Sequence, residues 1–560
     1  MTSETFRRGA LCALLFTPLL ALNGCKPKEI PPAVGQIIQS TVGTKTVPAS
    51  LRDQKERVRA WEEMRSFYEK RQFQPAWFTA KGPRPQAEEL IRSIDPLANE
   101  GLDPRRYQKD KLAALLKEIE ENHSFDDPQE QQRLARADMS LTYTFLTLAA
   151  HVASGRLQPE TLKIDWYTKP RRVDLDARLA ESLTEKGTIH QTLDSYAPPG
   201  KDYTRLREAL ARYRGIAAQG GWPLVGAELN MKSKGEPVRR LRARLAAEGY
   251  LPAAASPQAP GQAPDNDVYD PALAAAVQRF QHLHGLETNG KVDAPTLAEL
   301  DIPAAARVQQ IQVNLERWRW LPNDFGARYI KVNIPEFKMQ LVDGGKTALE
   351  MRVVVGKAQQ SRTPVFSDKM DYLELNPYWN IPADIVKEEI EPGIAKDPNY
   401  LARKNMEVVT QGSEQRYRQR PGPDNSLGQV KFMFPNQFDI YLHDTPADHL
   451  FAKAERDFSH GCIRLEKPID LADYLLKDDP KWTPQAIREV IASGEQKTIS
   501  IPRPLPVHIL YFTAWVEEDG TVEFRPDVYG ADAKLIQALA KEPPVALDFD
   551  NLKGQVRAAL

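Results

Sequence analysis

The chain has 560 residues, with 75 Lys and Arg against 76 Asp and Glu, and its formal net charge is −1 at pH 7. This balance provides no overall positive field of the kind that attracts nucleic acid, so we expect no nucleic-acid partner. The length suggests about four domains at ~150 residues each, and the 41% of hydrophobic residues is enough for them to form cores.

The N-terminus has the pattern of an export signal. Arg7 and Arg8 precede an apolar stretch from Ala10 to Leu22, which ends in Leu22-Asn23-Gly24-Cys25. The stretch is shorter than the ~20 residues of a membrane-spanning helix, so we expect a signal peptide over residues 1–24. The last four residues resemble a bacterial lipobox, which implies a lipid on Cys25, a periplasmic location and, with Lys26 next, the outer membrane. Simple cleavage that leaves a free exported N-terminus is the alternative.

Residues 25–50 are rich in Pro, Val, Thr and Ser without a sustained period, and we expect a tether there. The segment 51–232 has helical periodicity. Between Leu134 and Val152 apolar residues recur every three to four positions, and Gly155 then supplies a stop. We therefore predict an all-helical scaffold domain, with an aromatic core formed by Trp61, Phe67, Phe73, Trp77 and Phe78.

The segment 233–303 forms a separate unit. A helix with Val238, Leu241 and Leu245 and a second helix around Phe280 are followed by a glycine turn and a last short helix that opens at Thr296-Leu297. This unit resembles the three-helix peptidoglycan-binding module, although a Pro/Ala/Gln segment interrupts it. An inert spacer is the alternative.

From about Ala327 the apolar period changes to two, which predicts a mostly β domain over residues 304–530. Within it, residues 383–427 are charged and at first helix-prone, and we interpret them as a helical capping insertion over the site. Residues 531–560 are expected to form a C-terminal tail. The predicted fold class is multidomain α+β.

One thiol stands out in the body of the chain. Of the three cysteines, Cys12 and Cys25 lie in or at the end of the export segment, which leaves Cys462 in the run Ser459-His460-Gly461-Cys462-Ile463-Arg464. A thiol with an ordinary pKa of ~8.5 is only slightly ionised at neutral pH, and a nearby imidazole corrects this. Cys462 is therefore the candidate nucleophile.

His443 is the candidate base for this thiol. Strand alternation places Tyr441 and His443 on one face, which we expect to be the more open one, while Ile440 and Leu442 point to the core. Gly461 allows a positive φ, so the amides around Gly461 and Cys462 are candidates for an oxyanion site. Arg464 has two interpretations, as a loop anchor and as a substrate-carboxylate contact.

His443, fifteen further residues and Ser459-His460-Gly461-Cys462 resemble the signature of the L,D-transpeptidases, the YkuD-type cell-wall cross-linking enzymes. The order of the parts resembles the large YcbB-type branch. The resemblance implies that Cys462 attacks the carbonyl at the L-centre of diaminopimelate in a tetrapeptide stem, that D-Ala leaves, and that a second stem's side-chain amine takes the acyl group. It implies His443 as the base, while His460, Gly461 and Ser459 shape the site and Arg464, Tyr441, Asp444 and Trp379 contact the substrate.

Asp444 stands where many smaller relatives have Gly, so either its carboxylate or a backbone carbonyl orients His443. The expected partners are peptidoglycan stems and glycan, with wall synthases as further candidates, and the expected state is a monomer without cofactor or metal.

Other activities compete with cross-linking. Water as acceptor would give an L,D-carboxypeptidase or endopeptidase, and a protein lysine would give attachment of an outer-membrane protein. A zinc hydrolase using the histidines and acids near Cys462 lacks a HExxH pair, and a non-catalytic wall-binding scaffold remains a further class.

Overall fold

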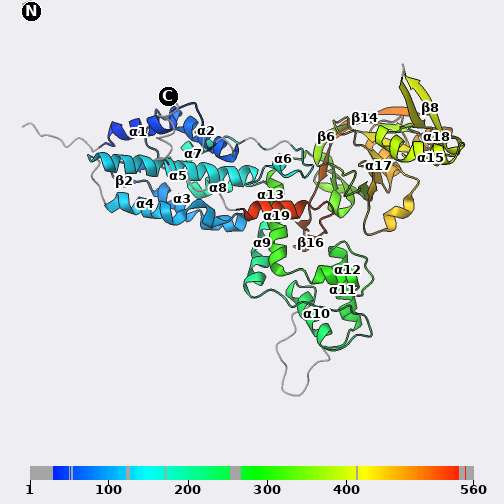
Figure 1. Ribbon diagram of the computed structural model, residues 1–560, viewed down its shortest axis with the longest axis horizontal. Helices are drawn as coiled ribbons and strands as arrows, with labels where there is room; N and C mark the ends of the chain where they lie inside the picture. Colours follow the sequence, from blue (N-terminus) through cyan, green and yellow to red (C-terminus); the bar gives the residue numbers. More distant parts are fainter. Residues whose placement is uncertain are drawn as a thin grey trace, which may run out of the picture.

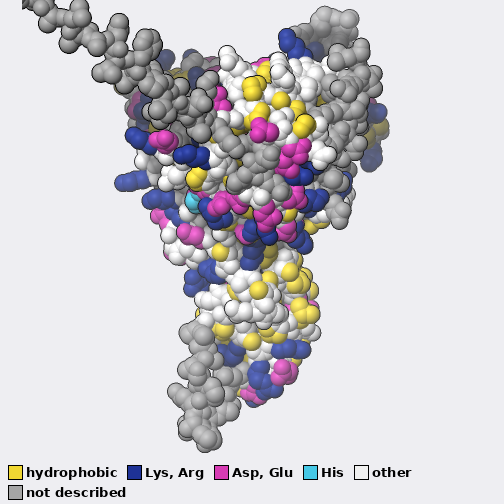
Figure 2. Space-filling view, turned by 90° about the vertical axis from the view of Figure 1, so that its left-hand side faces the viewer, with side chains coloured by type: hydrophobic (Ala, Val, Ile, Leu, Met, Phe, Trp, Pro, Cys, Tyr) yellow, Lys and Arg dark blue, Asp and Glu magenta, His cyan; other side chains and the backbone are white. Residues whose placement is uncertain are grey.

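The computed structural model describes residues 29–48, 51, 55–121, 126–168, 171, 173–251, 267–411, 414–541 and 549. A helical region lies at one end of the molecule and a β-rich domain at the other, and a small helical unit projects between them (Figure 1). On the helical end, Lys and Arg side chains lie interspersed with Asp and Glu (Figure 2). Within the described residues, no helix combines the length and apolarity needed to cross a bilayer. The export signal and Cys25 lie outside these residues.

The N-terminal region packs short helices around one long helix. Its helices are α1 (Pro32–Val42), α2 (Lys55–Lys70), α3 (Pro85–Arg92), α4 (Lys109–Glu121), α5 (Pro128–Ser154), α6 (Pro159–Leu162), α7 (Leu175–Ser182), α8 (Ile189–Asp194) and α9 (Lys201–Ala218). The 3₁₀ turns η2 (Asp95–Glu100) and η3 (Pro104–Tyr107) and a small hairpin of β1 (Phe78–Thr79) and β2 (Gly82–Pro83) complete the region.

Helix α5 is the axis of this region. Its N-terminus is fixed by Asp127, whose side chain accepts from the Gln129 N–H, and Pro128 occupies the first turn. Buried Asp138 on α5 accepts hydrogen bonds from the backbone N–H groups of Ala76 and Trp77 at 2.8 Å each, and from the Tyr68 hydroxyl at 2.6 Å. The predicted aromatic core is confirmed, since four of its five members are at most 2% exposed and Phe73 packs against them.

The tether prediction is wrong over residues 32–42. Helix α1 packs against α5, with Val34, Ile38 and Val42 fully buried in the helical core. These three residues are spaced by four, so the segment has a short apolar stripe that its Pro, Ser and Thr content obscured.

The small unit consists of α10 (Glu236–Ala247), α11 (Pro271–Leu283) and α12 (Ala294–Leu300). Val238, Leu241, Leu245 and Phe280 are fully buried in its core, as the periodicity predicts. The Gln281 amide ties the glycine turn to the last helix, donating to the Lys291 carbonyl at 2.8 Å and to Thr296 Oγ1 at 3.0 Å.

Helix α13 (Ala304–Arg319) joins the three parts of the molecule. It contacts α5 and α9 of the helical region, and β15 (Ala514–Val516) and α19 (Ala531–Ala540) of the C-terminal part. Buried ion pairs fix it: Arg307 pairs with Glu299 of α12 at 2.6 Å, and Arg317 pairs with Asp532 of α19 at 2.6 Å. The tail prediction is therefore wrong over 531–540, because α19 buries Ala531 and Leu535 against the β-rich domain.

The β-rich domain is built on a sheet of nine strands in the order β12-β5-β13-β11-β10-β6-β14-β3-β4, and pairing of β4 with β5 closes it. The strands are β3 (Arg328–Asn333), β4 (Lys338–Asp343), β5 (Lys346–Gly356), β6 (Phe366–Leu375), β10 (Val430–Met433), β11 (Leu442–His443), β12 (Asp457–Ser459), β13 (Ile463–Leu465) and β14 (Lys497–Leu510). Closure leaves a packed apolar interior, against which α17 (Pro468–Leu476) and α18 (Pro484–Ser493) pack. The hairpin of β15 and β16 (Val522–Phe524) packs instead with α9 and α13.

The insertion after β6 is only half helical, so the prediction of a helical cap is wrong for its second half. It begins with β7 (Trp379–Asn380), α14 (Ala383–Ile385), the π-helix η5 (Val386–Ile390), α15 (Glu391–Lys396) and α16 (Tyr400–Arg403). It then forms a hairpin of β8 (Met406–Gln411) and β9 (Glu414–Gln419), which pairs with β7 in a three-stranded sheet. The hairpin is held by Glu407, which accepts from both Arg418 and Arg420.

Candidate active site

The two residues of the predicted pair lie at adjacent strands, since His443 is in β11 and Cys462 directly precedes β13. Strands β11 and β13 run parallel, with Leu442 opposite Ile463 and His443 opposite Arg464, and the Ile463 N–H donates to the Tyr441 carbonyl at 3.1 Å. Leu442 and Ile463 are fully buried in the barrel interior. Residues opposite each other on paired strands share a face, and successive residues along a strand alternate between faces. The face away from the barrel interior therefore carries Tyr441, His443, Cys462 and Arg464.

Two glycines shape the backbone at the thiol. Gly461 has φ +114°, a region that L side chains rarely adopt, and a Cβ on Gly356 would lie 3.0 Å from the Gly461 Cα. Thr363 links the two glycines, since its hydroxyl donates to the Gly461 carbonyl at 2.6 Å and accepts from the Gly356 N–H at 2.9 Å. The Cys462 backbone is thereby anchored to β5.

Ser459 changes the expected oxyanion site. Its hydroxyl donates to the Cys462 carbonyl at 2.6 Å and accepts from the Gly461 N–H at 3.1 Å. The Gly461 amide is therefore engaged, and the prediction that it holds an oxyanion is wrong for this conformation. The Cys462 N–H has no hydrogen-bond partner in the described part of the chain, so it is the available donor.

The Cys462 thiol is partly buried, and burial raises its pKa. Opposing this, the backbone N–H and the hydroxyl of Tyr441 hydrogen-bond to the sulfur and lower its pKa, as does the charge of Lys431. Sγ also lies 3.7 Å from the Asp439 carbonyl. Tyr441, predicted as a substrate contact, is therefore a direct partner of the thiol.

His443 is only 4% exposed, so the expectation that it faces the more open side is wrong. Burial first, and then the positive charges of Arg464 and Lys431, lower its pKa to about 3. Its Nδ1 hydrogen-bonds to the backbone carbonyl of Asp444, and since a carbonyl only accepts, Nδ1 carries the proton. The neutral ring therefore presents Nε2 as a proton acceptor.

The group that orients His443 is thus the Asp444 backbone. The Asp444 carboxylate is used elsewhere, accepting from the Gln429 N–H and the Thr445 N–H at 2.7 Å each. Burial raises the pKa of this carboxyl. Asp444 fixes the turn after β11 and does not contact the imidazole through its side chain.

The cap explains the burial of the site. Glu389 of η5 lies 3.2 Å from His460 Nε2, and its charge also acts on Arg464. Trp379 of β7 hydrogen-bonds to the Tyr441 hydroxyl. His460 is itself exposed, and its contact with Glu389 connects the loop before Cys462 to the cap.

Lys431 is the site residue that the sequence reasoning missed. It lies opposite His443 in the β10–β11 pair, and its Nζ is 4.1 Å from the centre of the Tyr441 ring. Burial lowers its pKa. The signal was present, since Lys431 alternates with the buried Val430 and Phe432 and so shares a face with the site.

The buried guanidinium of Arg464 has an unused hydrogen-bond donor. Its Nε is buried without a hydrogen-bond partner among the described residues, and burial lowers its pKa. A guanidinium in this position suits a ligand carboxylate. In the same described part of the chain, no three His, Cys, Asp or Glu side chains are grouped so as to hold a metal ion.

Three family models match separate parts of the chain. They are "Scaffold domain" over residues 62–210, "Putative peptidoglycan binding domain" over 234–300, and "L,D-transpeptidase catalytic domain", the YkuD family, over 327–489. Together with the architecture, they confirm the predicted fold class of a helical N-terminal region, a peptidoglycan-binding domain and a mostly β catalytic domain.

A curated protein of Haemophilus influenzae, named "Putative L,D-transpeptidase", is 34% identical over 316 residues, which cover 52% of this chain and 63% of the relative. The chain thus spans less than two thirds of that relative.

Two solved L,D-transpeptidase structures also match. One, from Xylanimonas cellulosilytica, is 15% identical with a TM-score of 0.17, and the match covers 52% of this chain and 97% of that one. The other, from Stackebrandtia nassauensis, is 12% identical with a TM-score of 0.19, and the match covers 50% and 94%. Scores this low support no detailed structural inference.

Proposed function

We propose that this protein is an L,D-transpeptidase of the YcbB-type branch, which cross-links peptidoglycan stem peptides through a thioester on Cys462. The observation that supports the proposal is the parallel register of β11 and β13, in which His443 lies opposite Arg464 and Cys462 directly precedes β13. Both lie within the residues that match the L,D-transpeptidase catalytic domain.

The first half-reaction forms the thioester. Cys462 Sγ attacks the carbonyl at the L-centre of diaminopimelate in a tetrapeptide stem, and His443 Nε2 accepts the thiol proton. The C–N bond to D-Ala then breaks, and His443 returns the proton to the departing amine. Because the thiol and the imidazole are both neutral at rest, the proton moves together with the attack and not before it.

The second half-reaction transfers the acyl group. The side-chain amine of a second stem's diaminopimelate loses a proton to His443 and attacks the thioester carbonyl. The C–S bond breaks, and the sulfur recovers its proton from His443. During both steps, the Tyr441 donors stabilise negative charge on the sulfur, and the Cys462 N–H is placed to meet the oxyanion.

Substrate recognition follows from the unpaired Arg464 Nε. A donor stem that ends in D-Ala carries a carboxylate close to the reacting carbonyl, and a buried guanidinium with free capacity would bind it. The cap closes over the same face through Glu389 and Trp379 and would restrict access to an extended peptide.

The decisive experiment is mass spectrometry of the intact protein after incubation with a disaccharide-tetrapeptide. We expect a covalent adduct on Cys462 and release of D-Ala, and we expect a carbapenem to acylate the same sulfur. Cys462→Ala should abolish the adduct, whereas His460→Asn, which removes only the contact with Glu389, should retain it. An adduct on another residue, or none with folded protein, would refute the proposal.

The same incubation separates the acceptors. Dimeric muropeptide as the main product indicates the amine acceptor, while free tripeptide stem alone indicates water and an L,D-carboxypeptidase. Both routes use the same residues, so only the products distinguish them.

Export and anchoring form a second part of the proposal. The segment 1–24 and the lipobox-like Leu22-Asn23-Gly24-Cys25 support a periplasmic protein attached to the outer membrane through a lipid on Cys25. Membrane fractionation of the wild type and of Cys25→Ala tests this, because the variant should move to the soluble fraction. An unchanged distribution would contradict the anchor.

A further inference from the structure

Tyr167 is a residue of the helical region that lies beside the catalytic loop. It belongs to the part of the chain that matches the scaffold domain, yet its ring stacks on that of Phe438 with the ring centres 4.6 Å apart. Phe438 directly precedes Asp439, whose carbonyl lies 3.7 Å from Cys462 Sγ. The helical region therefore contributes a side chain to the rim of the catalytic face.

The backbone at Tyr167 is fixed to the β-rich domain. The Tyr167 N–H donates to the Val365 carbonyl at 2.7 Å, and the Val365 N–H donates to the Asp165 carbonyl at 2.8 Å. The next side chain along, that of Trp166, is 3% exposed and packs edge-on against Trp320 in the apolar core, with the ring centres 5.1 Å apart. The position of Tyr167 is therefore set before any ligand arrives.

The side chain of Tyr167 is 50% exposed despite this anchoring. A single exposed apolar side chain is ordinary on a protein surface. Here, however, the backbone is held in place and a second ring lies behind the first, so a ligand that stacks on the free face orders little of the protein. An aromatic face held in this way suits the apolar face of a ring-shaped ligand.

The parallel strands β11 and β13 give the catalytic face a direction. Along β13, Arg464 lies two residues beyond Cys462. Phe438 lies towards the opposite end, because it comes four residues before the start of β11. The thiol therefore lies between the guanidinium of Arg464 and the aromatic pair of Tyr167 and Phe438.

This order determines how a donor stem would lie across the site. With the D-Ala carboxylate at Arg464, the stem runs from there across Cys462 towards Tyr167. D-Ala is the last residue of the tetrapeptide, so the three preceding residues and then the sugars follow in that direction. Three residues span at most ~11 Å when extended, which keeps the sugars close to the rim of the catalytic face.

We propose that Tyr167 is a saccharide-binding residue of the active site, and that the sugar ring at the N-terminal end of the donor stem stacks on its face. The inference rests on the proposed function, since it takes the orientation of the donor from the D-Ala carboxylate at Arg464. A sugar ring has an apolar C–H face and a rim of hydroxyl groups, so it fits an aromatic ring that is half exposed to water. The helical region thereby favours a stem that still carries its sugars over a free peptide.

The test compares acylation of Cys462 in the full-length protein by a disaccharide-tetrapeptide and by the same tetrapeptide without sugars. Tyr167→Ala should lower kcat/KM for the disaccharide donor about tenfold, through a higher KM, and should leave the free tetrapeptide unchanged. Tyr167→Phe keeps the ring face and should restore the wild-type preference for the disaccharide donor. An equal loss for both donors, or no loss for either, would overturn the proposal.

Alkylation of Cys462 by iodoacetamide separates this role from a structural one. The hydrogen bonds that lower the pKa of the thiol come from Tyr441, so the pH profile of alkylation should be the same in Tyr167→Ala and the wild type. A shifted profile would mean that Tyr167 only positions the loop, and would overturn the proposal. 

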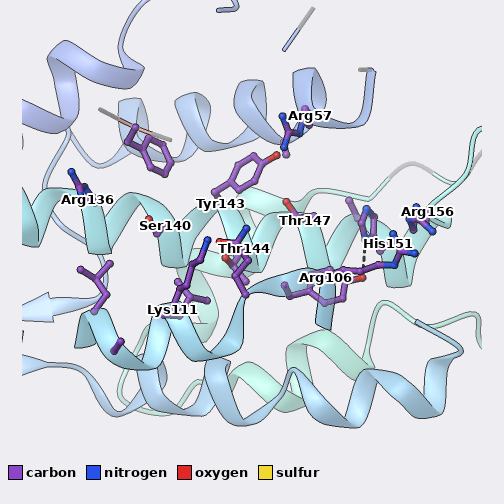
Figure 3. A pocket seen from close by; sticks show the side chains of 18 of the residues that line it. Arg57, Arg106, Lys111, Arg136, Ser140, Tyr143, Thr144, Thr147, His151 and Arg156 are labelled. Carbon is purple, nitrogen blue, oxygen red and sulfur yellow. Dashed lines mark hydrogen bonds between the residues drawn. The ribbon is translucent and has the colours of Figure 1, made fainter. Parts of the chain in front are cut away.

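A control from the same helical region is Lys111→Ala, in the cationic cleft between α4 and α5 (Figure 3), which should affect neither donor. If neither donor forms an adduct on the wild type, the proposed function itself is refuted. If both donors form adducts equally well on the wild type and on Tyr167→Ala, only the role of Tyr167 is refuted.

Discussion

Replacing Tyr441 with Phe tests how the thiol of Cys462 is activated. The substitution keeps the ring, which lies 5.6 Å from the His443 ring, but removes the hydroxyl that hydrogen-bonds to the sulfur. A hydrogen bond to a charged group contributes about 1.5–3 kcal/mol, and about 1.4 kcal/mol corresponds to a factor of ten. The backbone N–H of Tyr441 and the charge of Lys431 remain, so we expect the fraction of thiolate at a fixed pH to fall about tenfold or somewhat more.

The assay is the rate of alkylation of Cys462 by iodoacetamide across pH, because only the thiolate reacts. The midpoint of the profile should move to higher pH in Tyr441→Phe, and the rate on the rising limb should fall about tenfold. The control is Trp379→Phe, which removes the cap's hydrogen bond to the hydroxyl but keeps the bond to sulfur. An unchanged midpoint in Tyr441→Phe, or an equal shift in the control, would refute this account.

Three further predictions concern protonation and stability. Because burial lowers the pKa of His443 to about 3, the imidazole stays neutral above that pH, and the rate of acylation should show no loss centred between pH 6 and 7; such a loss in the pH profile would contradict its burial. Gly356→Ala should destabilise the β-rich domain by about 1–3 kcal/mol in thermal unfolding, since its Cβ would lie 1.9 Å from the Ser361 carbonyl oxygen, whereas Gly215→Ala, with open space in α9, should be neutral or stabilising. Asp138→Ala should cost about 3–5 kcal/mol in the urea unfolding of the helical region, because three buried donors lose their acceptor, and a change below ~1 kcal/mol would contradict that role.

The sequence was sufficient for features that depend on local periodicity. The spacing of apolar residues in α5 and α10 predicted helices whose apolar faces are buried, and strand alternation correctly placed Tyr441 and His443 on a common face. These features repeat within a few residues, so a short stretch of sequence is enough to predict them.

Features created by distant segments could not be predicted in this way. His443 is buried because Trp379 and Glu389, more than fifty residues earlier, bring the cap over its face. This burial depends on tertiary placement, which overrides what the local pattern suggests. The Gly461 amide is instead engaged locally, since it donates to the hydroxyl of Ser459 two residues earlier, and the residue pattern does not reveal the rotamer of that side chain.

Errors at the two ends of the chain had a different cause. The helical stripe of α1 is visible in the spacing of Val34, Ile38 and Val42, but the Pro, Ser and Thr content of the segment is typical of a tether. For α19, the burial of Leu535 depends on packing in the core of the β-rich domain and on α13, which ends more than two hundred residues earlier. In the middle of the chain, the polar side chains of β8 and β9 masked those two strands.

Helix α13 has a consequence for the distance between the small helical unit and the face that holds Cys462. Its buried ion pairs, Arg307 to Glu299 on one side and Arg317 to Asp532 on the other, are directional and resist sliding, since breaking either leaves an isolated charge without water. The unit of α10–α12 and the face that holds Cys462 are therefore kept at a constant distance from each other. If the unit of α10–α12 holds the polymer on which the proposed reaction takes place, the thiol would reach that polymer only at a fixed distance from the bound point.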